Sequence, residues 1–222
     1  LQQLENEQQN VPYVHVFATL SALKQICDHP ALMLEESAPE KFESGKFELL
    51  KELIAEGLAS GQKIVIFSQY VRMIKIISNY LDNHSIHHAV LTGQSRNRGD
   101  IIDKFQTDPT CKVFCGSLLA GGMGIDLTAA SIVIHYDRWW NPSKENQATD
   151  RAFRIGQVRR VQVHKFLCVG TLEEKIDEMI ERKKTTAEDV VGVGENWLTE
   201  MSTEQLQDLF TLRQGALGVE ES

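Results

Sequence analysis

Gln147, Arg151 and Arg154 lie in the stretch QATDRAFRIGQ and combine one amide with two permanent cations. Asn141, which a proline follows, is a favourable helix start, and Gly156 is placed to end that helix. On such a helix the three side chains fall at positions i, i+4 and i+7, within one face about 60° wide. Because guanidinium groups bind phosphate oxygens bidentately, this face is predicted to bind the transferring phosphate of a nucleotide.

The same helix allows a second interpretation, in which its charged face is ordinary solvated surface. Arg151 and Arg154 would then pair locally with Asp150 or Glu145, as exposed side chains one helical turn apart often do. Taken in isolation the helix favours this second interpretation, so the neighbouring motifs have to decide.

A glycine-rich stretch, SLLAGGMGID, follows a predicted strand and contains Ser117, Gly121, Gly122, Gly124 and Asp126. Clustered glycines let backbone N–H groups approach a phosphate, but tight turns need glycine as well. Asp126 suits either a sugar hydroxyl or the cap of the next turn. The residues alone leave both pairs of alternatives open.

Asp137 ends a hydrophobic run, IVIHYD, in the manner of a Walker B strand that holds magnesium. However, the sequence contains no GxxxxGK[ST], the motif whose backbone and lysine hold a triphosphate. The stretch from Gly57 to Lys63 has glycines and a lysine, but at the wrong spacing and without the Ser or Thr. The sequence therefore predicts half of a nucleotide site, with no metal ligands of its own.

Five short runs rich in β-branched residues predict strands that alternate with helices or loops. These runs are KIVIFS (63–68), HAVLTG (88–93), KVFCGS (112–117), SIVIHYD (131–137) and VQVHKFL (161–167). Such alternation predicts an α/β fold with a mainly parallel sheet covered by helices on both faces. Ligands of such sheets meet the loops at the carboxyl ends of the strands.

Helical segments flank this sheet. Apolar residues at helical spacing predict a helix after Pro12 that stops near His29, which we expect to be a cap or surface residue. Thr171 with Glu174, and Ser202 with Gln205, are capping-box candidates. We expect three parts, namely a helical lead-in and connector (1–44), the main lobe (45–185) and a helical C-terminal extension (186–222).

The composition is that of an ordinary globular chain, with 222 residues, 42% hydrophobic content and a net charge of −8. No apolar run approaches the eighteen or so residues of a membrane span, and the polar N-terminus does not resemble a signal peptide, so we expect no membrane partner. Because the chain begins without methionine, we expect it to be a piece of a longer protein. The negative charge disfavours a diffuse nucleic-acid coat but is compatible with a local cationic cleft.

Four cysteines, Cys27, Cys111, Cys115 and Cys168, lack the spacing of a disulfide-rich domain and favour a reducing, intracellular compartment. Cys111 and Cys115 fall in a predicted strand, where residues i and i+4 face the same way. A metal pair is one interpretation, but no further Cys or His at ligand spacing supports it. We therefore expect no metal site.

The ordered motifs IVIFSQY, LTGQSRNR, SLLAGGMGIDLTAA, YDRWWNP and QATDRAFRIGQ resemble the C-terminal RecA-like lobe of the SWI/SNF-related ATPases in helicase superfamily two. The resemblance runs from about Gln25 to Glu178 and implies a RecA-like, three-layer α/β fold. The stretch VGVGENWLTEMSTEQLQDLF resembles an extension seen mainly in bacterial members. A cytoplasmic, nucleoid-associated location is implied for a bacterial protein, and a nuclear one for a eukaryotic protein.

This resemblance implies roles for individual residues. Arg151 and Arg154 match arginines that reach a triphosphate held by the other lobe, with Arg154 as the arginine finger. Further nucleotide contacts are implied for Gln147, Gly122, Gly124 and Asp126. Contacts with the DNA backbone, or coupling to it, are implied for Ser68, Gln69, Thr92, Gly93, Ser117, Gly121 and Trp140.

The sequence departs from the family pattern at a few positions. Phe153 stands where histidine is frequent, Leu119 where lysine is common, Thr92 where aspartate is common and Asp126 where asparagine is more usual. Leu119 removes a cation near phosphate, which puts a DNA contact at that residue in doubt.

The resemblance also implies cofactors and partners. ATP and Mg²⁺ would be held mainly by an N-terminal RecA-like lobe of the same protein, which makes that lobe and the backbone of double-stranded DNA the expected partners. A DNA-bound protein complex, such as a polymerase, is a further expected partner. Two alternatives stay open, namely a catalytically silent interaction module with a helicase-like fold and a lobe of an RNA helicase.

Overall fold

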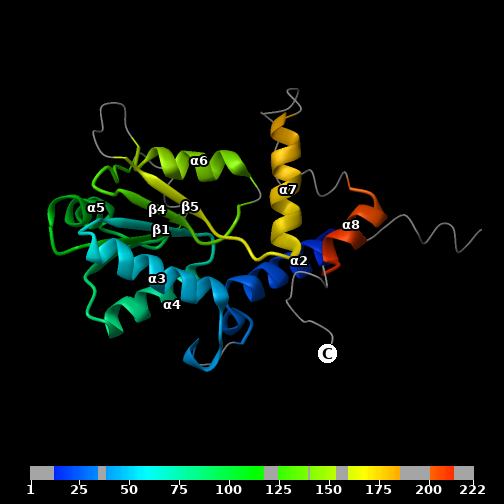
Figure 1. Ribbon diagram of the computed structural model, residues 1–222, viewed down its shortest axis with the longest axis horizontal. Helices are drawn as coiled ribbons and strands as arrows, with labels where there is room; N and C mark the ends of the chain where they lie inside the picture. Colours follow the sequence, from blue (N-terminus) through cyan, green and yellow to red (C-terminus); the bar gives the residue numbers. More distant parts are fainter. Residues whose placement is uncertain are drawn as a thin grey trace, which may run out of the picture.

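The computed structural model describes residues 13–34, 39–117, 125–139, 141–153, 160–185 and 201–212 (Figure 1). Helices α3 (Gly45–Ala59) and α4 (Val71–Asn83) lie on one side of a central sheet, and α6 (Pro142–Asp150) lies on the other. Helices α2 (Tyr13–Asp28), α7 (Leu172–Thr185) and α8 (Thr203–Phe210) gather together at one end of this lobe. The predicted three-layer α/β architecture is confirmed.

Five parallel strands form the sheet in the order β2-β3-β1-β4-β5. Their bounds are β1 (Ile64–Ser68), β2 (His88–Leu91), β3 (Val113–Ser117), β4 (Ile132–His135) and β5 (Gln162–Lys165). Each strand lies within one of the five predicted runs. The three central strands β3, β1 and β4 are buried along their whole length, which explains their continuous apolar sequences.

One face of the sheet packs against α3 and α4. Leu50 and Ile54 of α3 and Ile74 and Ile77 of α4 belong to the same buried cluster as alternate residues of the strands. At Gly57 helix α3 approaches the sheet closely, because an added Cβ would lie 2.8 Å from the end of the Ile64 side chain. A larger residue at this position would force the Ile64 side chain to move.

The opposite face packs against α5 (Arg98–Thr107), α6 and the segment before β4. Phe105 of α5, Ala148 of α6 and Leu127 belong to this second core. Cys111 lies in this core, whereas Cys115 lies in the core on the other face. The two thiols therefore cannot share a metal ion, because the strand begins only at Val113 and the predicted alternation does not extend to Cys111.

A third cluster joins α2, α7 and α8. Leu20, Ile176, Ile180 and Leu209 are its buried members. Helix α7, which the sequence assigned to the main lobe, thus packs against helices from the lead-in and the extension. The three domain boundaries stay a prediction.

Local signals set the helix ends. The Ser202–Gln205 capping box at α8 is confirmed. At α7 the Thr171 hydroxyl accepts a hydrogen bond from the N–H of Glu173, and the Glu174 carboxylate accepts one from the N–H of Gly170.

His29 acts as the expected cap, since its side chain accepts a hydrogen bond from Ala31 at the start of the short helix η2 (Pro30–Leu32). A second short helix, η3 (Pro39–Lys41), lies in the connector. Among the described helices, none is both long and apolar enough to cross a membrane.

Candidate functional site

The carboxyl ends of the central strands meet along one edge of the sheet. Ser68 pairs in register with Ser117, and Leu91, the last residue of β2, pairs with Gly116. The residues that follow these strands, including Gln69 and Thr92, therefore lie along the same edge. Residues proposed to contact DNA come together here from three separate motifs.

Ser68 and Gln69 are both engaged with the segment that follows β4. The Ser68 side chain is fully buried, and its hydroxyl donates to Asp137 at 2.5 Å. Gln69 donates its backbone N–H to the same carboxylate at 3.2 Å and its amide to the carbonyl of Arg138 at 2.9 Å. The Ser68 hydroxyl is thus not available for contact with DNA in this structure. Its place supports a positioning role instead.

Asp137 is a buried structural carboxylate and does not resemble an open magnesium ligand. Burial raises the pKa of Asp137, whereas the Lys24 ammonium and the Ser68 hydroxyl lower it. Lys24 comes from α2 and donates to the carbonyl of Arg138 at 2.5 Å. The end of β4 is therefore bonded both to the end of β1 and to the lead-in helix.

Thr92 and Gly93 form a closed turn after β2. The N–H of Thr92 donates to the Ser95 hydroxyl at 2.9 Å, and the N–H of Ser95 donates to the Thr92 carbonyl at 3.1 Å. Gly93 and Arg96 are exposed, and nothing lies within 4 Å of a Cβ added at Gly93. The turn can be approached closely from solvent and has a cation beside it.

Helix α6 begins where the sequence predicts, because the Asn141 side chain accepts a hydrogen bond from Ser143. It ends earlier than predicted, at Asp150 rather than near Gly156. The N–H of Ala152 bonds to Thr149 three residues back, which tightens the last turn.

A tertiary hydrogen bond accompanies this early end, since the Arg151 carbonyl accepts from the N–H of Leu127 at 2.9 Å. Gln147 and Arg151 still share one face, because Arg151 keeps a helical backbone conformation. The prediction of a single helix that carries Arg154 as well is wrong, since α6 stops four residues before it.

Arg151 does not form the local ion pair of the second interpretation. Glu145 is fully buried and already holds three partners, since it pairs with Arg138, pairs with Lys165 at 3.0 Å and accepts the N–H of Trp139 at 2.8 Å. Within the described ranges, Arg151 forms no ion pair, and its Nε is buried without a hydrogen-bond partner. Among the described residues, the Arg151 guanidinium is therefore not committed to an acidic side chain.

Asp126 takes the second of the two roles left open by the sequence, the cap of the next turn. Its Oδ1 accepts from the N–H and the hydroxyl of Thr128 at 3.0 and 2.7 Å and from Gln106 at 2.9 Å. Asp126 directly precedes Leu127, which bonds to Arg151, so the glycine-rich motif and the arginine motif adjoin. Asp126 and Arg151 are 25 residues apart in the sequence, and packing in the second core brings their two motifs together.

Some predicted site residues lie outside the described residues. They are Gly121, Gly122, Gly124, Trp140 and Arg154. Ser117 is described and nearly buried at the end of β3.

Sequence reasoning missed a buried charge network beside the site. Arg138 is 1% exposed and pairs with Glu145 of α6 and, at 2.5 Å, with Asp177 of α7. It links the arginine-bearing helix to the helical cluster. The one sequence signal is an arginine inside the otherwise largely aromatic stretch YDRWW, which does not reveal its partners.

A second buried network joins α3 to the lead-in helix and α7. Lys46 pairs with Asp28 at 2.9 Å and with Glu173 at 2.6 Å, and all three side chains are buried. Burial opposes the charge on Lys46, yet the two carboxylates raise its pKa above the ordinary value. The three side chains form one ionic cluster.

Residues 45–156, half of the chain, match the family described as the helicase conserved C-terminal domain. The chain belongs to this family. Over 204 residues this helicase lobe is 46% identical to YwqA of Bacillus subtilis, provisionally named an ATP-dependent helicase/translocase, with 89% of this chain and 22% of YwqA covered. The chain thus spans about a fifth of that relative.

Two solved structures place the lobe within the SWI/SNF-related branch. The Sulfolobus solfataricus SWI2/SNF2 ATPase core in complex with double-stranded DNA matches with a TM-score of 0.77 and 45% identity, over 89% of this chain and 42% of that one. The C-terminal domain of the Sulfolobus solfataricus SWI2/SNF2 ATPase matches with a TM-score of 0.73 and 42% identity, over 89% and 82%. The chain contains the C-terminal RecA-like lobe of a SWI/SNF-related ATPase.

Proposed function

We propose that this chain is the second motor lobe of a DNA-dependent ATPase that moves along double-stranded DNA and remodels DNA-bound protein complexes. Its family and its similarity to an ATPase core with bound duplex DNA support this function. The other lobe, which would carry the phosphate-binding loop, is a proposed part of the complete protein.

The observation that carries the proposal is that Arg151 forms no ion pair with another described residue. Glu145, one of its two acidic candidates on α6, is committed to other cations, and within the described ranges the buried Nε of Arg151 has no hydrogen-bond partner. A guanidinium is suited to the charge that develops on a transferring phosphoryl group. Arg154 follows three residues later and is proposed as the arginine finger, with Gln147 beside Arg151 on α6.

ATP and Mg²⁺ would be held mainly by the other lobe. Asp137 is not proposed as a magnesium ligand, because its oxygens are occupied by Ser68 and Gln69. When bound there, Mg²⁺ would neutralise phosphate charge. This chain would orient the nucleotide and add positive charge to the transition state.

The DNA side of the lobe is proposed to lie at the carboxyl edge of the sheet. The exposed Thr92–Gly93 turn can approach a phosphate through its backbone, and Arg96 can supply a charge. Such contacts are independent of sequence and sensitive to salt. The logarithm of the association constant for duplex DNA should fall linearly with the logarithm of the salt concentration, and Arg96→Ala should make that slope shallower by about 1.

The nucleotide role can be tested in the full-length protein. Arg154→Ala, and separately Arg151→Ala, should lower the turnover number of DNA-stimulated ATP hydrolysis, by about 10³-fold or more for the finger. The matched control is Lys144→Ala, which removes an exposed cation from the same helix. Retained turnover in Arg154→Ala, with normal turnover in the control, would refute the finger assignment.

The same assay separates the proposal from its alternatives. Stimulation by duplex DNA supports a translocase, whereas stimulation by RNA alone supports an RNA helicase lobe. Absence of ATP hydrolysis with every nucleic acid supports a silent interaction module. We expect duplex DNA to stimulate most strongly, because the lobe is similar to the core solved with double-stranded DNA.

The C-terminal extension is proposed to brace the lobe and tune its closure on the partner lobe. Helix α8 packs on α7, and α7 is tied through Asp177 and Arg138 to the segment before α6. Deleting the residues after Gly192 from the full-length protein should change the ratio of DNA-stimulated to basal ATP hydrolysis. An unchanged ratio would show that the extension only packs against the lobe and does not tune its closure.

A further inference from the structure

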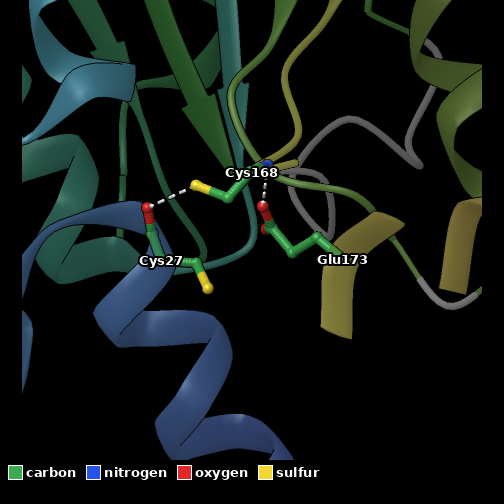
Figure 2. Close-up of side chains that lie close together, drawn as sticks. All are labelled: Cys27, Cys168 and Glu173. Carbon is green, nitrogen blue, oxygen red and sulfur yellow. Dashed lines mark hydrogen bonds between the residues drawn. The ribbon is translucent and has the colours of Figure 1, made fainter. Parts of the chain in front are cut away.

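Two cysteines that are far apart in the sequence meet where α2 ends and α7 begins (Figure 2). Cys27 is the last residue but one of α2, and Cys168 lies between β5 and α7. Their sulfur atoms and a carboxylate oxygen of Glu173 all lie within 4.8 Å of one another. Both thiols are partly exposed, so a small oxidant can reach them.

The geometry does not favour a metal ion at this cluster. Both oxygens of Glu173 are engaged, one with the Lys46 ammonium at 2.6 Å and the other with the backbone N–H of Cys168 at 2.8 Å. A cation would have to displace the ammonium. No group of four candidate ligands is present among the described residues, whereas structural zinc sites take four.

The environment of the two thiols favours redox chemistry between them. The Cys168 thiol donates a hydrogen bond to the backbone carbonyl oxygen of Cys27 at 3.4 Å (Figure 2). The neighbouring Cys168 thiol, with smaller effects of Thr171 and Lys46, lowers the pKa of Cys27 although burial acts in the opposite direction. The neighbouring Cys27 thiol and burial raise the pKa of Cys168. Cys27 is therefore the better thiolate and nucleophile.

We propose that Cys27 and Cys168 form a reversible disulfide when the protein meets a peroxide. The Cys27 thiolate attacks one peroxide oxygen, the O–O bond breaks, and Cys27 becomes a sulfenic acid while the departing hydroxide takes up a proton to become water. The Cys168 sulfur then attacks the Cys27 sulfur, and the S–O bond breaks. The hydroxyl leaves as water with the Cys168 proton, so two thiols and one peroxide give one disulfide and two waters.

Rotation of the side chains is needed to close the bond, since a disulfide requires a sulfur separation of about 2 Å. The new bond would join α2 covalently to the start of α7. It would restrain α2, whose Lys24 holds the carbonyl of Arg138 just before α6. Oxidation thus fixes the lead-in helix against the lobe.

The experiment uses the full-length protein, treated with graded hydrogen peroxide, blocked with iodoacetamide and digested for mass spectrometry. We expect a peptide pair linked through Cys27 and Cys168 that disappears after dithiothreitol. Before oxidation, Cys27 should be alkylated about tenfold faster than the buried Cys111, because alkylation requires an accessible thiolate. Cys111→Ser is the matched control and should leave the linked pair unchanged.

Two variants separate the steps. Cys168→Ser should stop at the sulfenic acid of Cys27, which dimedone traps, whereas Cys27→Ser should give neither the linked pair nor a trapped adduct at Cys168. Thermal unfolding of the reduced variants checks that each one folds. Absence of the linked pair in the folded wild type, or pairing of Cys27 with a different cysteine, would overturn the proposal. So would one zinc ion per chain that both variants lose, which would show a metal site.

Discussion

His135 should make this lobe sensitive to mild acid, because its ring is buried as a neutral group. The side chain is fully buried at the end of β4, its Nε2 lies 2.9 Å from the Thr149 hydroxyl, and its ring stacks on Phe67 at 5.6 Å. Within the part of the chain that the structure describes, its buried Nδ1 has no hydrogen-bond partner. Burial lowers the pKa of His135 from 6.5 to about 4, and Glu145 only partly opposes this effect.

The direction of the pH dependence follows from proton binding at His135 in the folded and unfolded states. Between pH 6.5 and about 4 the unfolded chain binds a proton at His135 and the folded chain does not, so the free energy of unfolding falls as the pH falls through this window. The loss is about 2 kcal/mol at pH 5 and saturates at about 3 kcal/mol below pH 4, because each tenfold difference in proton affinity between the two states is worth roughly 1.4 kcal/mol. Stability from this residue is complete above pH 6.5.

The assay is urea unfolding of the wild-type chain and His135→Phe at several pH values between about 4.5 and 8. Other groups titrate in this range, but they cancel in the difference between the two proteins. The free energy of unfolding of the wild type, relative to that of His135→Phe, should fall by about 2 kcal/mol between pH 8 and pH 5. His87→Gln, at an exposed histidine, is the control for effects unrelated to burial. A wild-type minus variant difference that stays constant with pH would refute a buried neutral His135.

Two further predictions concern folding free energy. Lys46→Met should destabilise the chain by about 3 to 5 kcal/mol in urea unfolding, because it removes the ion-pair partner of the buried carboxylates of Asp28 and Glu173. The partly exposed cation of Lys51 gives the control, since Lys51→Met should cost less than about 1 kcal/mol, and equal losses would contradict the argument. Ser202→Ala should cost about 1 kcal/mol and speed hydrogen exchange in α8, because it removes the cap of that helix. Unchanged exchange would show that packing alone holds α8.

The sequence anticipated the fold well where local signals dominate. Runs such as KIVIFS are short, rich in β-branched residues and apolar in their centre, which favours a buried central strand. Asn141 before proline marked the start of α6 correctly, because capping needs only neighbouring residues. The end of α6 was misjudged, because it is accompanied by a hydrogen bond from Leu127, 24 residues earlier in the chain.

The sequence by itself determined the alternation of strands and helices, the family and the residues that could meet a phosphate, because periodicity, caps and motifs are properties of short stretches. Only the tertiary structure decided which charges are already paired. Lys24 reaches Arg138 across 114 positions and Lys46 reaches Glu173 across 127, and no short-range pattern encodes such partners. Glu145 is held by Arg138 and Lys165, so within the described ranges it forms no ion pair with Arg151, and that distinction depends on packing.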